Sequence, residues 1–428
     1  MLHCNGAASR RRVCWPASLA LQLSLVLLFG TSGGGAQVQC AAGSAGSAYT
    51  HFVSTLAGSG NWGSQDGSAS SATFNNPSGV AVTPDGSKAV VCDRGNNKIR
   101  LVDMATGRVS TLAGSGSYGF QDGAASSARF NNPSGVVVTL DGRTAVVSDR
   151  GNDKIRLVDM ATGRVGTLAG SGTYGFQDGA ASSARFSNPT GLAVTSDGSK
   201  AVVTDYFNNK IRVVDIATGT VITLAGSGSY GSQDGAAGSA TFNNPTGVAV
   251  TPDGSKAVVA DRGNVKIRLV DMVTGAVITL AGSGGYGSQD GTAGSARFSY
   301  LSGVAVTPYG SKAVVADTSN HKICLVDMAT GAVIALAGSG SYGFQDGLAS
   351  SARFYCPTGV ALTSNGSKAV VIDENNHKIR LVDLMMPTCV VCEVLSFNQC
   401  CPCHSGGCED ALDSAKCHIV ETLNVWET

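Results

Sequence analysis

The chain has 428 residues, and 30 basic side chains balance 30 acidic ones, so its formal net charge at pH 7 is zero. No window of the sequence concentrates lysine and arginine. Because a protein that binds nucleic acid normally presents a basic face, this balance argues against a nucleic-acid partner.

Residues 1–36 have the order of a secretory signal peptide. Arginines at 10–12 form a basic region, residues 18–30 form an apolar region, and small residues then lead to a cleavage point after Ala36. The apolar region is shorter than the roughly 20 residues that a membrane-spanning helix needs. We therefore expect cleavage rather than anchoring: a secreted, extracellular protein with no transmembrane segment in the mature chain, beginning with a flexible lead over residues 37–51.

The next part of the chain repeats one unit at a constant spacing of 56 residues. Each unit contains four short runs rich in Val and Ile and bounded by Gly, Pro, Asp and Asn, which is typical of strands. The connections are too short for parallel pairing, so each unit is predicted to be a four-stranded antiparallel blade of a propeller. In the first copy the runs cover residues 78–84, 88–93, 98–103 and 108–114, and the hexapeptide TLAGSG (ALAGSG in the last copy) begins at Thr55, Thr111, Thr167, Thr223, Thr279 and Ala335.

The number of copies predicts how the ring closes. The first three strands of the unit occur six times, the last set ending at Asp383, where a fourth strand is missing. A spare copy of that strand, HFVSTLAG, lies at residues 51–58. Pairing it with the last blade removes the open edges of the sheet. The sequence thus predicts an all-β, six-bladed propeller over residues 52–383, in which the N-terminal strand closes the last blade.

The repeated pattern resembles the NHL-repeat family of six-bladed propellers. The resemblance is carried by NPSGVAVTPDG, by AVVCDRGNNKIRLVD, and by TLAGSG with a following QDG and ARF, over roughly residues 52–383. It implies a fold, whereas the family includes receptors, RNA binders and a lyase, so it does not determine function. The family's amidating lyase needs a metal-binding histidine set that cannot be placed in this sequence.

The C-terminal segment, residues 384–428, differs in composition and holds seven of the 13 cysteines. Behind an export signal this density favours a small disulfide-bonded tail over a zinc site, although the run of CVVC and CCPC could bind a metal in the cytosol. Removal of the leader would take Cys4 and Cys14 and leave 11 cysteines of 13, so at least one thiol is free or pairs with another molecule. The tail cysteines, of undetermined pairing, are Cys389, Cys392, Cys400, Cys401, Cys403, Cys408 and Cys417.

Four repeated or modifiable motifs have simple interpretations. GSGSYG matches G-x-G-x-x-G, but a loop follows it in place of the helix that a dinucleotide site requires. Asp93 with Asn96, repeated in each blade, indicates a hairpin turn. Asn365 begins an N-x-S sequon in an exposed strand turn and is a candidate glycosylation site. The aspartate of each QDG loop is expected to cap a turn, with a bound cation as the alternative; these are Asp66, Asp122, Asp178, Asp234, Asp290 and Asp346.

Candidate catalytic residues are few. His321 and His377 occupy the same slot in neighbouring blades, where they could share a metal or act as acid and base. No third ligand is visible, so exposed loop residues are the simpler interpretation. We therefore expect no cofactor, with a divalent cation as the alternative.

The copies differ most in the turn between their second and third strands, which in a propeller lies on the same face as the QDG connection. Variation confined to the loops of one face is typical of recognition on a fixed scaffold, although drift in a tolerant loop would look the same. Arginine and aromatic side chains are common in binding hot spots. The candidate ligand-binding residues are Arg94, Arg150, Tyr206, Phe207, Arg262 and Glu374 from this turn, and Trp62, Tyr118, Tyr174, Tyr230, Tyr286 and Tyr342 from the long connections.

Near-identical copies offer the same groups six times, whereas an active site needs unlike groups in one constellation. We therefore expect a non-catalytic binding scaffold for a protein or an acidic glycan. Aromatic side chains would stack on the ligand while arginines pair with its carboxylates. The alternative is an extracellular, metal-dependent lyase or a lactonase-type hydrolase on the same fold.

Overall fold

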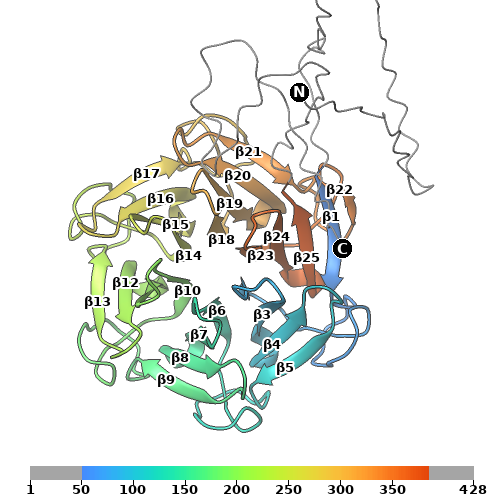
Figure 1. Cartoon of the computed structure of the whole chain (residues 1–428). Helices are drawn as coiled ribbons and strands as arrows, with labels where there is room; N and C mark the ends of the chain where they lie inside the picture. Colours follow the sequence, from blue (N-terminus) through green and yellow to red (C-terminus); the bar gives the residue numbers. More distant parts are fainter. Residues whose placement is uncertain (1–50, 385–428) are drawn as a thin grey trace, which may run out of the picture. The chain divides into compact units, whose positions relative to one another are not determined.

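The computed structural model describes residues 51–384 and arranges them as a ring of six antiparallel sheets around a central channel (Figure 1). The predicted signal peptide, all but the last residue of the lead, and the cysteine-rich tail lie outside the described residues. Within residues 51–384 no helix is long and apolar enough to cross a membrane. The predicted all-β, six-bladed architecture is confirmed.

Each blade runs outward from the channel in chain order, joined by short hairpins. Blade one contains β2 (Val80–Val82), β3 (Lys88–Asp93), β4 (Lys98–Asp103) and β5 (Val109–Ala113). Blade two contains β6 (Pro133–Val138), β7 (Thr144–Asp149), β8 (Lys154–Asp159) and β9 (Val165–Ala169). Blade three contains β10 (Pro189–Val194), β11 (Lys200–Asp205), β12 (Lys210–Asp215) and β13 (Val221–Ala225). Blade four contains β14 (Pro245–Val250), β15 (Lys256–Asp261), β16 (Lys266–Asp271) and β17 (Val277–Ala281). Blade five contains β18 (Leu301–Val306), β19 (Lys312–Asp317), β20 (Lys322–Asp327) and β21 (Val333–Ala337).

Blade six is closed by the other end of the ring. It contains β23 (Pro357–Leu362), β24 (Lys368–Asp373) and β25 (Lys378–Asp383), and β1 (Phe52–Ala57) pairs antiparallel with β25, with Val53 opposite Val382. In Figure 1 the blue β1 lies beside the red-brown β25. A two-residue strand, β22 (Gly347–Leu348), adds a fifth strand outside β1. The predicted strand exchange is confirmed, and β22 is an addition that the sequence pattern did not predict.

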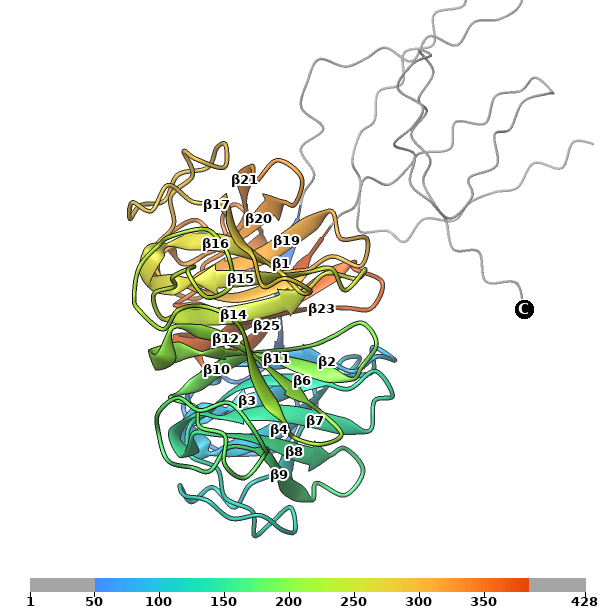
Figure 2. The ribbon, with the colours of Figure 1, turned by 90° about the vertical axis from the view of Figure 1, so that its left-hand side faces the viewer.

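The apolar core lies between blades. Seen edge-on, neighbouring blades pack face to face (Figure 2). The cluster between blades three and four, for example, joins Val202 and Val213 to Val248 and Val259 around Phe242, whose side chain is fully buried. Because each apolar cluster needs residues from two neighbours, a blade is stable only within the ring.

The innermost strands approach one another so closely that only glycine fits. A Cβ placed on Gly247 would lie 2.2 Å from the carbonyl oxygen of Ser302 in the next blade. The equivalent glycine of every blade meets the next blade in the same way, at 2.1–2.5 Å. A hydroxyl beside the glycine also bonds across the gap, as when Thr246 Oγ1 donates to the Leu301 carbonyl at 3.0 Å. These contacts set the narrow diameter of the channel.

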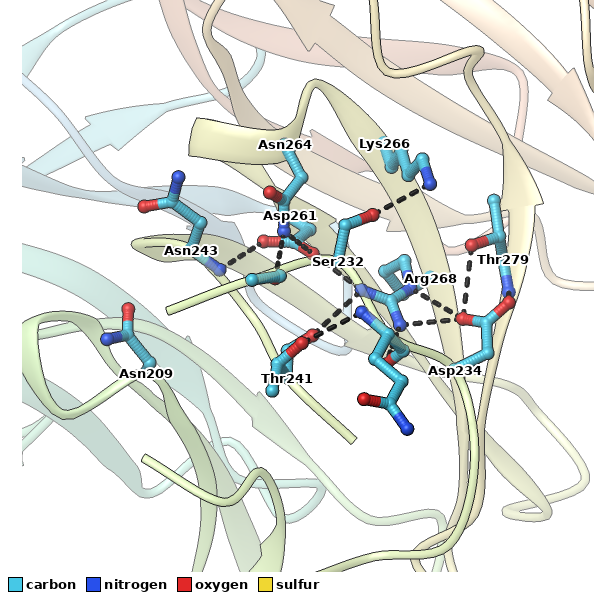
Figure 3. A network of polar contacts seen from close by, with 12 residues as sticks. Asn209, Ser232, Asp234, Thr241, Asn243, Asp261, Asn264, Lys266, Arg268 and Thr279 are labelled. Carbon is cyan, nitrogen blue, oxygen red and sulfur yellow. Dashed lines mark hydrogen bonds and ion pairs between the residues drawn. The ribbon is translucent and has the colours of Figure 1, made fainter. Parts of the chain in front are cut away.

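A buried arginine organises the polar interior of five blades. In blade four, Arg268 is fully buried and its Nη1 donates to Asp261 at 2.7 Å and to the Thr241 carbonyl at 3.1 Å (Figure 3). Its Nη2 donates to Asp234, the aspartate of the QDG loop, at 2.6 Å and to the Gln233 carbonyl at 2.9 Å. The same arrangement recurs around Arg100, Arg156, Arg212 and Arg380.

The repeated aspartates therefore act in a larger network than a turn. Asp234 does accept a backbone N–H, from Thr279 at 3.0 Å, as expected of a turn aspartate, but its main partner is the guanidinium of Arg268. Asp261 accepts the Asn264 amide at 2.8 Å, which confirms the predicted Asp–Asn turn. The asparagine also donates to the Gly231 carbonyl and so ties the turn to the long connection of the same face.

Candidate functional site

Five of the six variable turns place their first residue in the lining of the central channel, at one mouth; that of the sixth, Tyr206, lies against Arg150. Each turn is a three-residue 3₁₀ helix: η1 (Arg94–Asn96), η2 (Arg150–Asn152), η3 (Tyr206–Asn208), η4 (Arg262–Asn264), η5 (Thr318–Asn320) and η6 (Glu374–Asn376). Each joins the second strand of a blade to the third, close to the channel axis. The channel cavity has a volume of about 240 Å³, and its lining includes Arg94, Arg150, Arg262, Thr318 and Glu374.

Three arginines and one glutamate give this mouth an excess of positive charge. Arg94 Nη2 pairs with Glu374 Oε1 at 2.5 Å, which neutralises one arginine. Arg150 and Arg262 form no ion pair with any residue in the part of the chain that the structure describes. Two cationic groups are thus left to face a ligand.

Aromatic and polar neighbours hold these two arginines in place. The guanidinium of Arg150 stacks over Tyr206, 5.3 Å from the ring centroid, and its Nε donates to Asn188 Oδ1 at 3.0 Å. Arg262 stacks over Tyr300 at 5.2 Å. Within residues 51–384, Arg150 donates one hydrogen bond and Arg262 none, so most of their guanidinium N–H groups are left for a ligand while the aromatic rings support the side chains.

Burial disfavours the charged form of both Arg150 and Glu374, so it shifts their pKa values in opposite directions. It lowers the pKa of Arg150, and the neighbouring cations Arg94 and Arg262 lower it further. It also raises the pKa of Glu374, although Arg94 opposes that rise. An incoming anion would relieve the repulsion among the arginines.

Below the mouth, the channel wall offers little chemistry. It is lined by the repeated Ser-Gly or Thr-Gly pairs of the inner strands and by the aliphatic residue that follows. The hydroxyl of Ser78, for example, donates to the Ser134 carbonyl of the next blade at 3.1 Å. Distinctive chemistry is therefore concentrated at the mouth.

The six aromatic residues of the long connections are exposed. Their exposed fractions run from 54% for Tyr286 to 82% for Tyr230. They therefore do not wedge between blades. Phe207, at the second position of η3, is 56% exposed and packs edge-on against Tyr206. These side chains are available for contact on the same face as the mouth.

His321 and His377 occupy equivalent positions, at which the side chain forms a hydrogen bond to the next blade. His321 Nδ1 accepts the backbone N–H of Cys356 at 3.2 Å, and His377 Nδ1 accepts that of Asn76 at 3.2 Å. In blade three the same slot holds Asn209, whose Oδ1 accepts the Asn244 N–H at 2.9 Å. Burial lowers the pKa of both histidines, consistent with a neutral ring accepting at Nδ1.

Metal binding by these histidines stays a prediction. Among residues 51–384, no group of three or more His, Cys, Asp or Glu is placed to hold a metal ion.

The predicted modification sites fall in different regions. Asn365 lies exposed in the turn between β23 and β24, where its Oδ1 accepts from Ser367 N at 3.0 Å. Glycosylation there stays a prediction. The seven tail cysteines lie outside the described residues, and the three cysteines inside them, Cys92, Cys324 and Cys356, are free thiols.

The sequence located most of the mouth, because the turns that differ among copies supply it. The sequence did not identify Thr318 as a lining residue, although Thr318 is the first residue of one of these variable turns. It also missed the buried arginine of five blades, although five of the six third strands carry an arginine at the same place.

Comparison with known proteins agrees with the pattern of repeats. No family model matches the chain. The chain is 30% identical over 320 residues to "Protein SUPPRESSOR OF QUENCHING 1, chloroplastic" of Arabidopsis thaliana, covering 72% of this chain and 30% of that protein. It is 28% identical over 339 residues to "NHL repeat-containing protein 2" of Homo sapiens, covering 72% of this chain and 46% of the relative. The chain is an NHL-type six-bladed propeller. It spans less than half the length of these relatives.

Solved structures share the fold of this NHL-type propeller. An auxiliary nutrient binding protein from Bacteroides ovatus superposes with a TM-score of 0.58 at 20% identity, covering 78% of this chain and 76% of that one. A gluconolactonase from Xanthomonas campestris superposes with a TM-score of 0.51 at 15% identity, covering 78% and 89%. At these identities the likeness concerns the fold, on which binding proteins and enzymes both occur.

Proposed function

We propose that this NHL-type propeller is a secreted, non-catalytic binding module that takes a carboxylate-bearing ligand at the mouth of its channel. The observation that supports this proposal is a pair of arginines, Arg150 and Arg262, that have no ion-pair partner within residues 51–384. Aromatic rings hold both side chains beside Arg94, which is paired with Glu374. A guanidinium with free N–H groups matches a carboxylate by two parallel hydrogen bonds.

The size of the cavity limits what can enter. A volume of about 240 Å³ is below the 300–1,000 Å³ typical of pockets that enclose a drug-sized molecule. One acidic sugar or one acidic side chain would enter the mouth, and the rest of the ligand would lie across the loop face. There the exposed aromatics of the long connections can stack against sugar rings or apolar side chains.

The experiment compares two double variants of the secreted chain. R150A/R262A removes the two free cations, whereas R108A/R164A removes two exposed arginines from the short turns after β4 and β8. Charge-assisted hydrogen bonds contribute about 1.5–3 kcal/mol each. Binding of an acidic oligosaccharide should therefore weaken about 100-fold or more in R150A/R262A and change little in R108A/R164A.

Titration calorimetry with a hexuronic-acid oligosaccharide and with an acidic peptide separates the two ligand classes. Thermal melts establish that both variants remain folded. Equal affinities for R150A/R262A and the parent chain would refute the assignment of the site. A stoichiometric divalent metal in the purified protein would favour the alternative, an extracellular metal-dependent lyase or lactonase-type hydrolase.

A further inference from the structure

Blade five lacks the buried arginine that organises the other five blades. The residue at that position is Cys324, which pairs with Val315 across β19 and β20. In blade four, Arg268 pairs with Val259 in the same register, and a bulge precedes both residues. Cys324 is 3% exposed. A short thiol thus replaces a guanidinium at an identical place in the fold.

The groups that receive the guanidinium elsewhere are all retained. Asp290 and Asp317 correspond to Asp234 and Asp261 of blade four, and the carbonyls of Gln289 and Arg297 correspond to those that accept from Arg268. The backbone hydrogen bond that positions these carbonyls is kept: Arg297 N donates to the Gln289 carbonyl at 2.9 Å, as Thr241 N donates to the Gln233 carbonyl at 3.0 Å in blade four.

The retained carboxylates have fewer donors than their counterparts. Asp317 accepts from Ser299 N at 2.7 Å and from Asn320 Nδ2 at 2.6 Å. From residues 51–384, Asp290 accepts one hydrogen bond, from the backbone N–H of Ala335 at 2.8 Å, because it lacks both the arginine and the threonine hydroxyl that bond Asp234 in blade four. Within the described part of the chain, neither Asp290 nor Asp317 forms an ion pair, although Asp317 is only 1% exposed.

Neighbouring cations do not move in to replace the missing arginine. Lys322 Nζ donates to Ser288 Oγ at 2.9 Å, just as Lys266 donates to Ser232 at 2.7 Å in blade four, where the arginine is present. The side chain of Arg297 lies along the long connection, where its Cδ is 3.1 Å from the position of a Cβ on Gly287. Burial raises the pKa of Asp317 to about 6, the charge of Lys322 lowers it and that of Asp290 adds to the rise; Asp205, which keeps its arginine, also has a pKa of about 6.

We propose that blade five binds a guanidinium group supplied from outside the chain. Five copies of the same site in this one protein hold a guanidinium on the same set of acceptors, and the sixth keeps the acceptors without the group. The set suits a planar group with several N–H donors, since two carboxylates and two carbonyls converge on it over the ring of the buried Phe298. An ammonium or a metal ion would satisfy this arrangement less completely.

The site borders the solvent at its QDG-loop end. Asp290 is exposed there, as is its counterpart Asp234, whose side chain is 44% exposed beside a fully buried Arg268. The ligand is therefore a small guanidine or the arginine side chain of a partner protein, entering past Asp290. This site lies within a blade, binds a cation and is independent of the anion site at the channel mouth.

The test uses thermal melts of the whole secreted chain with millimolar guanidinium chloride, far below denaturing concentrations. The unchanged chain should show a saturable rise in Tm, and C324R, which supplies the group internally, should show none. D290N, which removes an exposed carboxylate and should fold, is expected to weaken the apparent affinity by roughly tenfold or more. R268C recreates the vacancy in blade four and should gain a second guanidinium-dependent rise.

Further measurements distinguish the two possible sources of the guanidinium group and test for general effects of salt or cations. Methylguanidine and an arginine-containing peptide, each compared with its lysine or methylamine analogue, distinguish a small guanidine from a partner's side chain. Sodium, ammonium and calcium chlorides control for salt and for a general cation site. Identical guanidinium responses of the unchanged chain, C324R and D290N would overturn the proposal, and so would an equal rise with ammonium or calcium.

Discussion

Replacing the buried Arg268 by cysteine should destabilise the ring strongly. The substitution removes the partner of Asp261, a fully buried carboxylate that would keep only the N–H of Asn243 and the amide of Asn264, both at 2.8 Å. Breaking a buried ion pair on one side typically costs about 3–5 kcal/mol. We expect R268C to lose this amount of unfolding free energy, measured by chemical denaturation of the whole chain.

The loss of unfolding free energy in R268C should grow as the pH rises. Burial raises the pKa of Asp261, and Arg268 is one of the groups that lower it, so removing Arg268 raises it further. A carboxyl whose pKa is higher in the folded than in the unfolded state keeps the folded state protonated, and stability falls with rising pH. The stability of R268C should therefore begin to fall near pH 4, the ordinary pKa of an aspartate, and continue to fall up to the raised pKa of Asp261.

The matched control for R268C is R297C, an exposed arginine on the long connection of blade five. It removes the same charge and adds the same thiol, and its effect should stay within about 0.5 kcal/mol. A loss below about 1 kcal/mol in R268C, or a loss independent of pH, would refute the view that the arginine compensates a buried carboxylate.

Three further outcomes are expected. E374Q should strengthen carboxylate binding at the channel mouth, because it releases Arg94 from its 2.5 Å ion pair; titration calorimetry showing unchanged or weaker binding would contradict this. V265N should stabilise the ring by about 1 kcal/mol in chemical denaturation, because Val265 is held at φ 47° and lacks the hydrogen-bond acceptor that Asn209 provides. V273N, at an exposed position, should leave the free energy of unfolding unchanged. Deleting residues 52–57 should lower Tm and solubility by exposing the edge of β25, whereas deleting only residues 37–50 should change neither.

The sequence by itself determined the architecture of this protein. Strand alternation and turn residues are local signals, and the strands predicted at 88–93 and 98–103 match β3 and β4 residue for residue. The inner and outer strands of blade one, predicted at 78–84 and 108–114, are each shorter in the structure. Counting copies located the exchanged strand, because a closed ring leaves no edge unpaired.

The sequence also located the mouth of the channel, because the turns that differ most among the copies supply it. It could not show that five of their first residues line one cavity, or that Glu374 would neutralise Arg94 across 280 positions of the chain. Such pairings depend on closure of the ring, which brings the first and last blades together.

Only the tertiary structure decided the role of the buried polar residues. In the strand KIRLVD, Arg100 occupies a place that alternation alone assigns to either solvent or a polar interior. Its carboxylate partners lie 7 and 34 residues away, and they meet it only when the long connection folds back over the blade. The cysteine at position 324 likewise looks like an ordinary apolar substitution in the sequence. Its significance arises because the fold keeps two carboxylates and two carbonyls in place around a group that is no longer there.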